Sequence, residues 1–218
     1  MSVNLTNFES DLLRLCIVWA RVMTIYKEYP NHMKTGMHEV MVRHLFREVT
    51  VEQLHNFIKI RTDLLQNPEF KKLDDIIKDL LEPILAYEKP IKELRHNYVA
   101  HIQEKGRKFK VMMNDIILTY NFPTTFSFYR YMAGLVFFYC GIVERNFSKE
   151  WNKAMKKYNA KLGVAMSISS GFKMNDVDKK IVEILSPLQI RLFDNGYVTS
   201  VPKPVIDKLR IKYSKLKK

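Results

Sequence analysis

The sequence contains little glycine, proline and cysteine, and each shortage narrows the choice of fold. Seven glycines and eight prolines in 218 residues are too few for the many tight turns of a loop-rich all-β protein. The two cysteines, Cys16 and Cys140, both lie inside apolar runs. We expect two reduced, buried thiols in a reducing compartment, and a disulfide between them is the less favoured alternative.

The chain also lacks an apolar run long enough to cross a membrane. Its most apolar segment, residues 131–143, has 13 residues between Arg130 and Glu144, whereas a membrane-spanning helix needs roughly 20. The N-terminal residues show no basic region followed by an apolar one, so no signal peptide is predicted. We therefore expect a cytoplasmic protein that is not membrane-bound, with residues 131–143 as a buried helix.

Motifs for metal and nucleotide chemistry are missing as well. The sequence has no glycine-rich phosphate loop and no GxSxG, CxxC or HExxH motif. None of the six histidines is paired with cysteines or carboxylates at the spacing of metal ligands. The sequence therefore predicts neither a metal site nor a cofactor.

Negative charge is scarce in the last third of the chain. The net charge is +13, and residues 149–218 hold 16 Lys and Arg against 6 Asp and Glu. Residues 208–218 carry six basic residues and no acidic one. A field of this sign favours polyanions such as nucleic acids, while a solubilising tail is the alternative interpretation.

Helical periodicity is present along most of the length. A capping box at Thr6–Glu9 predicts a helix of about 22 residues that stops at Pro30. A second capping box at Thr50–Gln53 predicts that one helix ends near Val49 and that another begins there and ends at Asn67–Pro68. A further helical pattern covers Phe70 to about Glu104, and Pro90 either breaks it or begins a fresh helix.

The C-terminal half is expected to contain one long helix and several shorter pieces. Residues 107–122 fit either a hairpin or a loop followed by a short helix. A long helix should run from Thr124 or Thr125 to Tyr158, with Gly134 and Gly141 allowing close packing. A linker follows, and two short helices should start at Asn175 and Ser186.

These patterns together predict an all-α fold. We expect a bundle of about five main helices over residues 1–160, a linker or exposed loop over 161–174, and a small basic C-terminal appendage of short helices over 175–218.

One segment points to a specific chemistry, and it reads Arg95-His96-Asn97-Tyr98-Val99-Ala100-His101. Histidine titrates near neutral pH, so His101 suits proton transfer. Arg95 stays charged and offers a planar fork that matches phosphate oxygens. These are the groups that RNA cleavage without a metal requires.

The segment resembles the motif of the HEPN superfamily, whose ribonuclease members carry an arginine, four to six residues and then a histidine. A polar residue typically follows the arginine, as His96 does here. Leu94 before Arg95 and Val-Ala before His101 match the abortive-infection branch. The resemblance implies a HEPN-like helical bundle and a metal-independent endoribonuclease that leaves a 2′,3′-cyclic phosphate, in a toxin or phage-defence effector. It also implies an antitoxin or activating partner.

The expected site has catalytic, supporting and substrate-binding residues. Arg95 and His101 are the expected catalytic residues, and His96 and Asn97 would orient them or hold the substrate backbone. We assign RNA binding to Tyr98, Lys105 and Arg107.

Helix geometry limits how the two catalytic residues can meet. On one straight helix, His101 would point about 120° away from Arg95. A two-fold dimer that brings two such helices together would gather both pairs in one cleft. HEPN ribonucleases usually build such a composite site, so the resemblance also implies a homodimer.

Three alternatives stay open at this level. Arg95 could pair with Glu88 or Glu93, and His101 could be a helix C-terminal residue favoured by the helix dipole. The chain could keep a HEPN-like fold without cleaving RNA, as a nucleic-acid-binding or adaptor module that uses its basic C-terminal region. It could also be an unrelated helical protein.

Overall fold

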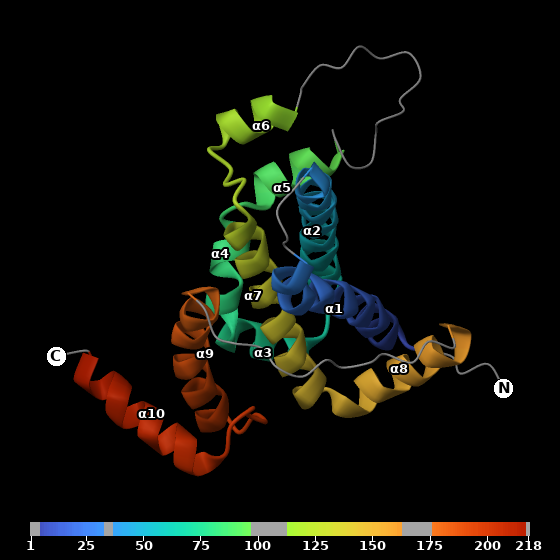
Figure 1. The fold of residues 1–218 in the computed structure, drawn as a ribbon. Helices are drawn as coiled ribbons and strands as arrows, with labels where there is room; N and C mark the ends of the chain where they lie inside the picture. Colours follow the sequence, from blue (N-terminus) through green and yellow to red (C-terminus); the bar gives the residue numbers. More distant parts are fainter. Residues whose placement is uncertain (1–4, 33–36, 97–112, 163–175, 217–218) are drawn as a thin grey trace.

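The protein is helical throughout the part of the chain that the computed structural model describes, which is residues 5–32, 37–96, 113–162 and 176–216 (Figure 1). No strand occurs in these ranges, so the predicted all-α class is confirmed. The elements are α1 (Asn7–His32), α2 (Met37–Leu64), α3 (Pro68–Ile76), the 3-10 helix η1 (Lys78–Leu80), α4 (Glu82–Leu85), α5 (Glu88–Leu94), α6 (Met113–Thr119), α7 (Phe126–Asn146), α8 (Ser148–Leu162), α9 (Asp176–Asp194) and α10 (Lys203–Leu216).

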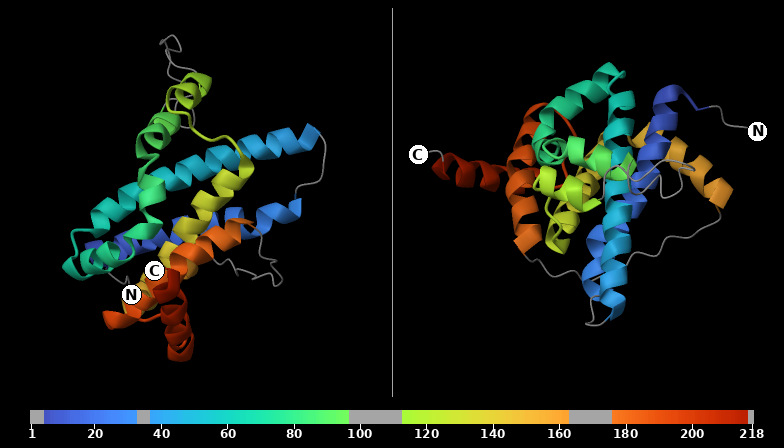
Figure 2. Two further views of the ribbon diagram at one scale, coloured as in Figure 1. Left: turned by 90° about the vertical axis from the view of Figure 1, so that its left-hand side faces the viewer. Right: turned by 90° about the horizontal axis from the view of Figure 1, so that it is seen from above.

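The core forms where α1, α2 and α7 pack against one another. Figure 2 shows α1 and α2 as two long helices that run alongside each other. The largest fully buried side chains include Phe57 of α2, Phe70 of α3, and Tyr129 and Tyr139 of α7. Because these side chains belong to one continuous cluster, the short helices α3 to α5 are anchored on the same core as the long ones.

The first predicted capping box is confirmed. The Thr6 amide donates to Glu9 Oε2 at 2.7 Å, and the Glu9 amide donates to Thr6 Oγ1 at 3.2 Å. The Lys153 ammonium of α8 also donates to both Glu9 oxygens, which lowers the pKa of Glu9. The same carboxylate therefore caps α1 and joins α1 to α8. The helix ends at His32, two residues beyond the predicted stop at Pro30.

The second predicted capping box is wrong. Helix α2 continues from Met37 to Leu64 without a break near Val49. Thr50 is fully buried, and its hydroxyl donates to the Phe46 carbonyl at 2.6 Å. A threonine can satisfy its hydroxyl one turn back inside a helix as well as at an N-terminus, so the Thr-x-x-Gln pattern did not mark a boundary here.

Between residues 68 and 94 the predicted single helix is replaced by several short pieces. Asn67 caps α3, since its Oδ1 accepts from the Glu69 and Phe70 amides at 3.0 Å. Pro90 lies in the first turn of α5, where the missing amide costs no helical hydrogen bond. A fresh helix does form here, but it begins at Glu88, so the prediction that Pro90 is its first residue is off by two residues. The rest of the predicted pattern, from residue 97 to about Glu104, lies outside the described residues.

The ambiguous segment is resolved as helix where it is described. Residues 113–119 form α6, so the second strand of a hairpin is excluded, and residues 107–112 lie outside the described ranges. The predicted long helix begins as expected after Thr125 but is divided at Phe147 into α7 and α8. Of the two glycines in α7, Gly134 is tightly packed, whereas Gly141 has no close neighbour in its Cβ direction.

The prediction of a helix start at Ser186 is wrong, because α9 runs through Ser186 and Pro187. Pro187 has no amide hydrogen, so it leaves the carbonyl of Glu183 without its usual helical donor. The Tyr213 hydroxyl of α10 donates to that carbonyl at 3.3 Å. Helix α10 thus binds to α9 at the point where the proline interrupts the helical hydrogen bonds.

Helix α9 contributes to the core beside α7. Ile181, Leu188 and Leu192 are fully buried in it, and the Arg191 guanidinium donates to Asp79 of η1 at 2.7 Å. Most of the predicted linker, from residue 163 to residue 174, lies outside the described residues. Figure 1 shows α10 projecting away from the other helices beyond α9.

Helix α7 is, within the described ranges, the one helix long and apolar enough to cross a membrane. Its apolar window is 67% buried among the other helices, which makes it a core helix, as residues 131–143 predicted. The expected buried thiols are also confirmed, since Cys16 and Cys140 are both buried and free. Burial raises the pKa of the Cys16 thiol to about 12.

Candidate nucleic-acid interface

Helix α5 has a buried apolar face and a separate basic face. Pro90, Ile91 and Leu94 are buried. Lys92, Arg95 and His96 follow the spacing i, i+3, i+4 and so share another face of the helix; Lys92 and His96 are exposed and Arg95 is half-buried. The apolar face therefore fixes the helix on the core and directs these three side chains away from it.

The backbone of this basic face departs from regular α-helix. Arg95 and His96 lie in π-helical backbone directly after α5, although Arg95 keeps α-helical dihedral angles and its amide still donates to the Ile91 carbonyl. Such turns are uncommon and often occur at functional sites. The irregular turn therefore coincides with the first two residues of the predicted motif.

Helix α2 packs against α5 and adds two basic residues. His55 is half-buried and Lys59, one turn further along, is exposed. The imidazole rings of His55 and His96 meet edge to face, with 5.5 Å between ring centroids and 77° between planes. We call the five residues His55, Lys59, Lys92, Arg95 and His96 the basic cluster.

The pKa of His55 is affected by the positive charges of the basic cluster. Burial lowers the pKa of His55 below its usual 6.5, and the positive charges of the four other cluster residues lower it further. His55 is therefore an uncharged imidazole at pH 7, with hydrogen-bonding capacity beside several cations. An anion placed there would be attracted by all of them.

The nearest predicted acidic partner of Arg95 is engaged elsewhere. Glu93 Oε1 accepts a hydrogen bond from the Tyr120 hydroxyl at 2.6 Å, and the Lys89 ammonium lies 5.3 Å from the centre of the Tyr120 ring. In the described ranges, Arg95 forms no ion pair with Glu88, Glu93 or any other carboxylate. A purely structural ion pair between Arg95 and a neighbouring carboxylate is thus not observed among the described residues.

The structure places only two of the predicted site residues. Arg95 and His96 are described and lie together, and the remaining predicted residues lie outside the described ranges: Asn97, Tyr98, His101, Lys105 and Arg107. His55 and Lys59 were not predicted. Their only local signal is a basic pair at i, i+4, and the packing of α2 on α5 is needed to bring them to Arg95.

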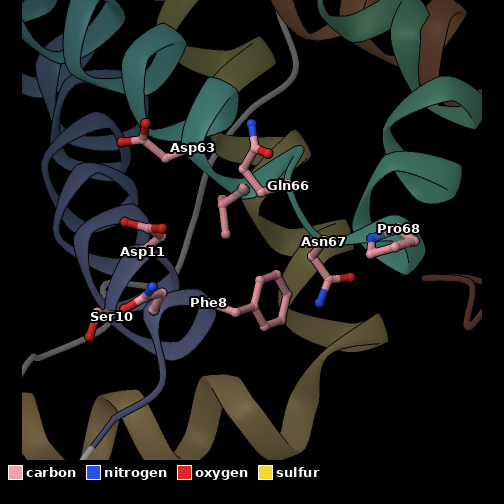
Figure 3. Close-up of a pocket in the computed structure, with 9 residues that line it drawn as sticks. Phe8, Ser10, Asp11, Asp63, Gln66, Asn67 and Pro68 are labelled. Carbon is pink, nitrogen blue, oxygen red and sulfur yellow. The ribbon is translucent and has the colours of Figure 1, made fainter.

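A pocket of about 540 Å³ lies at another place, between the start of α1 and the turn from α2 to α3 (Figure 3). Two of its lining carboxylates, Asp11 and Asp63, bind the Arg14 guanidinium at 2.8 and 2.9 Å. Asn67, also in the lining, caps α3 through its Oδ1. The pocket includes no residue of the basic cluster, and its acidic lining does not suit a polyanion.

No cluster of three or more histidine, cysteine or carboxylate side chains that could hold a metal occurs in the described ranges. Comparison with protein-family models, with curated proteins and with solved structures finds no match. The chemistry of the basic cluster and of the Arg95–His101 segment is therefore the basis for a function.

Proposed function

We propose that the chain is a metal-independent endoribonuclease of HEPN type, in which Arg95 and His101 are the catalytic residues. The observation that carries the proposal is the setting of Arg95, which acts on His55 together with His96, Lys59 and Lys92 and has no carboxylate partner in the described ranges. A cation in such a setting is suited to a phosphate group.

The proposed reaction uses proton transfer and charge stabilisation only. His101 takes the proton of a ribose 2′-hydroxyl as its oxygen attacks the adjacent phosphorus. The bond to the 5′-oxygen breaks, that oxygen takes a proton from water, and His101 returns its own proton to the solvent. The products are a 2′,3′-cyclic phosphate and a 5′-hydroxyl end. Arg95 stabilises the negative charge on the phosphorane oxygens. His96 and Asn97 orient these groups, and Tyr98, Lys105 and Arg107 bind the substrate.

The proposed active form is a homodimer with a composite site, built on a HEPN-like bundle of about five main helices. Helix geometry supports this form, because His101 on a continuing helix would point about 120° away from Arg95. By the same resemblance, the protein would act as a toxin or phage-defence effector, controlled by an antitoxin or an activating partner.

The test is RNA cleavage by purified protein in the presence of EDTA. Wild-type protein should cleave the RNA. The cleavage rates of Arg95→Ala and His101→Ala should be at least about 100-fold lower, because removing a general acid–base group or an oxyanion-stabilising group usually has an effect of this size. Lys71→Ala, an exposed cation on α3, is the matched control and should cleave as wild type does. Equal cleavage by all four proteins would refute the assignment.

A non-catalytic nucleic-acid-binding module is the second candidate, and the basic C-terminal helix favours it. Lys208 and Lys212 of α10 are exposed, while Arg210 is paired with Asp194 of α9. Truncation after Asp207 should then flatten the salt dependence of RNA affinity, and the motif variants should bind normally. The endoribonuclease proposal predicts instead that the motif variants lose cleavage in the full-length chain.

A further inference from the structure

We infer that His55 and Lys59 of α2 form, together with Lys92 of α5 and His96 just after α5, a binding subsite for the phosphodiester backbone of single-stranded RNA. The inference rests on the proposed function, since it extends the site at Arg95 onto a second helix. Neither His55 nor Lys59 belongs to the Arg95–His101 segment, so the sequence motif alone does not include them.

The geometry that carries the inference is the contact between two helices. The centroids of the His55 and His96 rings are 5.5 Å apart and the ring planes are at 77°, so α2 and the turn that follows α5 each bring an imidazole to one place. Lys59 and Lys92 are exposed, and both act on His55 electrostatically together with Arg95 and His96. The subsite therefore combines the half-buried imidazole of His55, the exposed imidazole of His96 and two flexible ammonium groups.

The charge balance of this contact favours an anion as its occupant. The like charges that act on His55 also repel one another, and the partial burial of His55 reduces the screening that water provides. Among the described residues, no ion pair involves Lys59, Lys92 or Arg95. A phosphate oxygen would accept hydrogen bonds from these groups and offset the repulsion.

A polymer backbone fits this arrangement better than a single phosphate. The cations are spread along one turn of α2 and one turn of α5, and Arg95 is already assigned to the phosphate that reacts. His55 and Lys59 would therefore hold a neighbouring phosphate of the same strand. Contacts of this kind set affinity and register, and they carry no base specificity.

The test is the affinity of the full-length protein for a short, fluorescently labelled RNA in which every 2′-hydroxyl is methylated, measured by anisotropy in EDTA. Methylation removes the nucleophile, so binding is measured without cleavage. His55→Gln and Lys59→Ala should each weaken binding, by about tenfold for the hydrogen-bonding His55, and Lys59→Ala should reduce the slope of log affinity against log salt by about one. Lys71→Ala should change neither quantity.

The outcomes separate this inference from the proposed function. Unchanged affinity in both α2 variants, or no binding of the probe by wild type, would overturn the subsite. If both α2 variants bound the probe as wild type does but Arg95→Ala still abolished cleavage, the endoribonuclease proposal would stand and only the subsite would be refuted. If wild type binds the probe through His55 and Lys59 but cleaves no unmodified RNA, the subsite holds and the proposed reaction fails. Lys59 is exposed, so its variant keeps the test valid if His55→Gln is unstable.

Discussion

The rings of His55 and His96 lie edge to face, 5.5 Å apart between centroids, although one residue belongs to the middle of α2 and the other follows the end of α5. Each ring thus lies within the electrostatic field of the other. Protonation of one imidazole opposes protonation of the second, and Arg95 adds a permanent charge beside both. The contact makes His55 the most informative titrating group of the basic cluster.

The first prediction concerns the titration of His55. Burial and the charges of Arg95, His96, Lys59 and Lys92 lower its pKa in the folded protein. The unfolded chain, with a pKa near 6.5, then binds more protons than the folded one between the two pKa values. Stability should therefore fall as the pH drops below about 6.5, and His55→Gln should reduce this loss.

Histidine NMR titration measures the same effect directly. The His55 signal should titrate below pH 6.5, and adding the methylated RNA should raise its pKa, because a bound phosphate favours the charged imidazole. A His55 pKa at or above 6.5 in the free protein would contradict the described surroundings of this residue.

The second prediction uses two glycines of one helix as a matched pair. A Cβ on Gly134 would collide with Ile181 Cδ1 of α9 and lie 2.9 Å from Tyr26 Cε2 of α1. A Cβ on Gly141 would meet only the Arg145 side chain, at 3.9 Å. Gly134→Ala should lower the free energy of unfolding by about 2 kcal/mol, and Gly141→Ala should raise it by about 0.5 kcal/mol.

Chemical denaturation of the two variants beside wild type provides the measurement. The opposite signs of the two changes in the free energy of unfolding matter more than their sizes, because both substitutions add the same methyl group to the same helix. Equal effects at the two positions would mean that α9 does not pack closely on α7 and α1 at Gly134.

The third prediction concerns a buried charge network in the core. Arg61 donates to Asp74 Oδ1 at 2.8 Å and to Oδ2 at 2.5 Å, and the Tyr139 hydroxyl donates to Oδ1 at 2.6 Å. Asp74 is 2% exposed, so its charge is compensated by these partners and not by water. Asp74→Asn leaves the Arg61 guanidinium without its anionic partner and should destabilise the protein by about 3 kcal/mol.

Asp75→Asn is the control for this change, because the neighbouring carboxylate lies exposed on the same helix. It should alter the free energy of unfolding by no more than about 0.5 kcal/mol. Similar midpoints of thermal unfolding for the two variants would argue against a structural role for the network.

The sequence predicted those parts of the fold that depend on local chemistry. The Thr6–Glu9 box follows from two groups three residues apart, and α7 begins after Thr125 as predicted, although the Thr125 side chain makes no capping hydrogen bond. The cap at Asn67 was not predicted, because Asn67–Pro68 was expected only to end the preceding helix. The same reasoning failed at Thr50 and Ser186, where an equally suitable pattern lies inside a continuous helix. There the hydroxyls bond one turn back, and packing of the helix decides the outcome.

The candidate site shows the same limit. Arg95 and His96 stand out because they are adjacent in the sequence and belong to a recognisable string. His55 and Lys59 could not be assigned, because their relation to Arg95 depends on how α2 packs against α5. A long-range contact of this kind leaves no periodicity or spacing in a single sequence.

The most direct test of the proposed function is the chemical identity of the RNA ends formed in EDTA by the full-length protein. Wild type should leave 2′,3′-cyclic phosphates and 5′-hydroxyls, detectable by mass spectrometry of a short RNA substrate. Arg95→Ala and His101→Ala should form neither end, while Lys71→Ala should form both. Intact RNA with wild type under every condition tested, or cyclic phosphate ends formed equally well by the His101→Ala protein, would contradict the assignment of Arg95 and His101 as the catalytic pair.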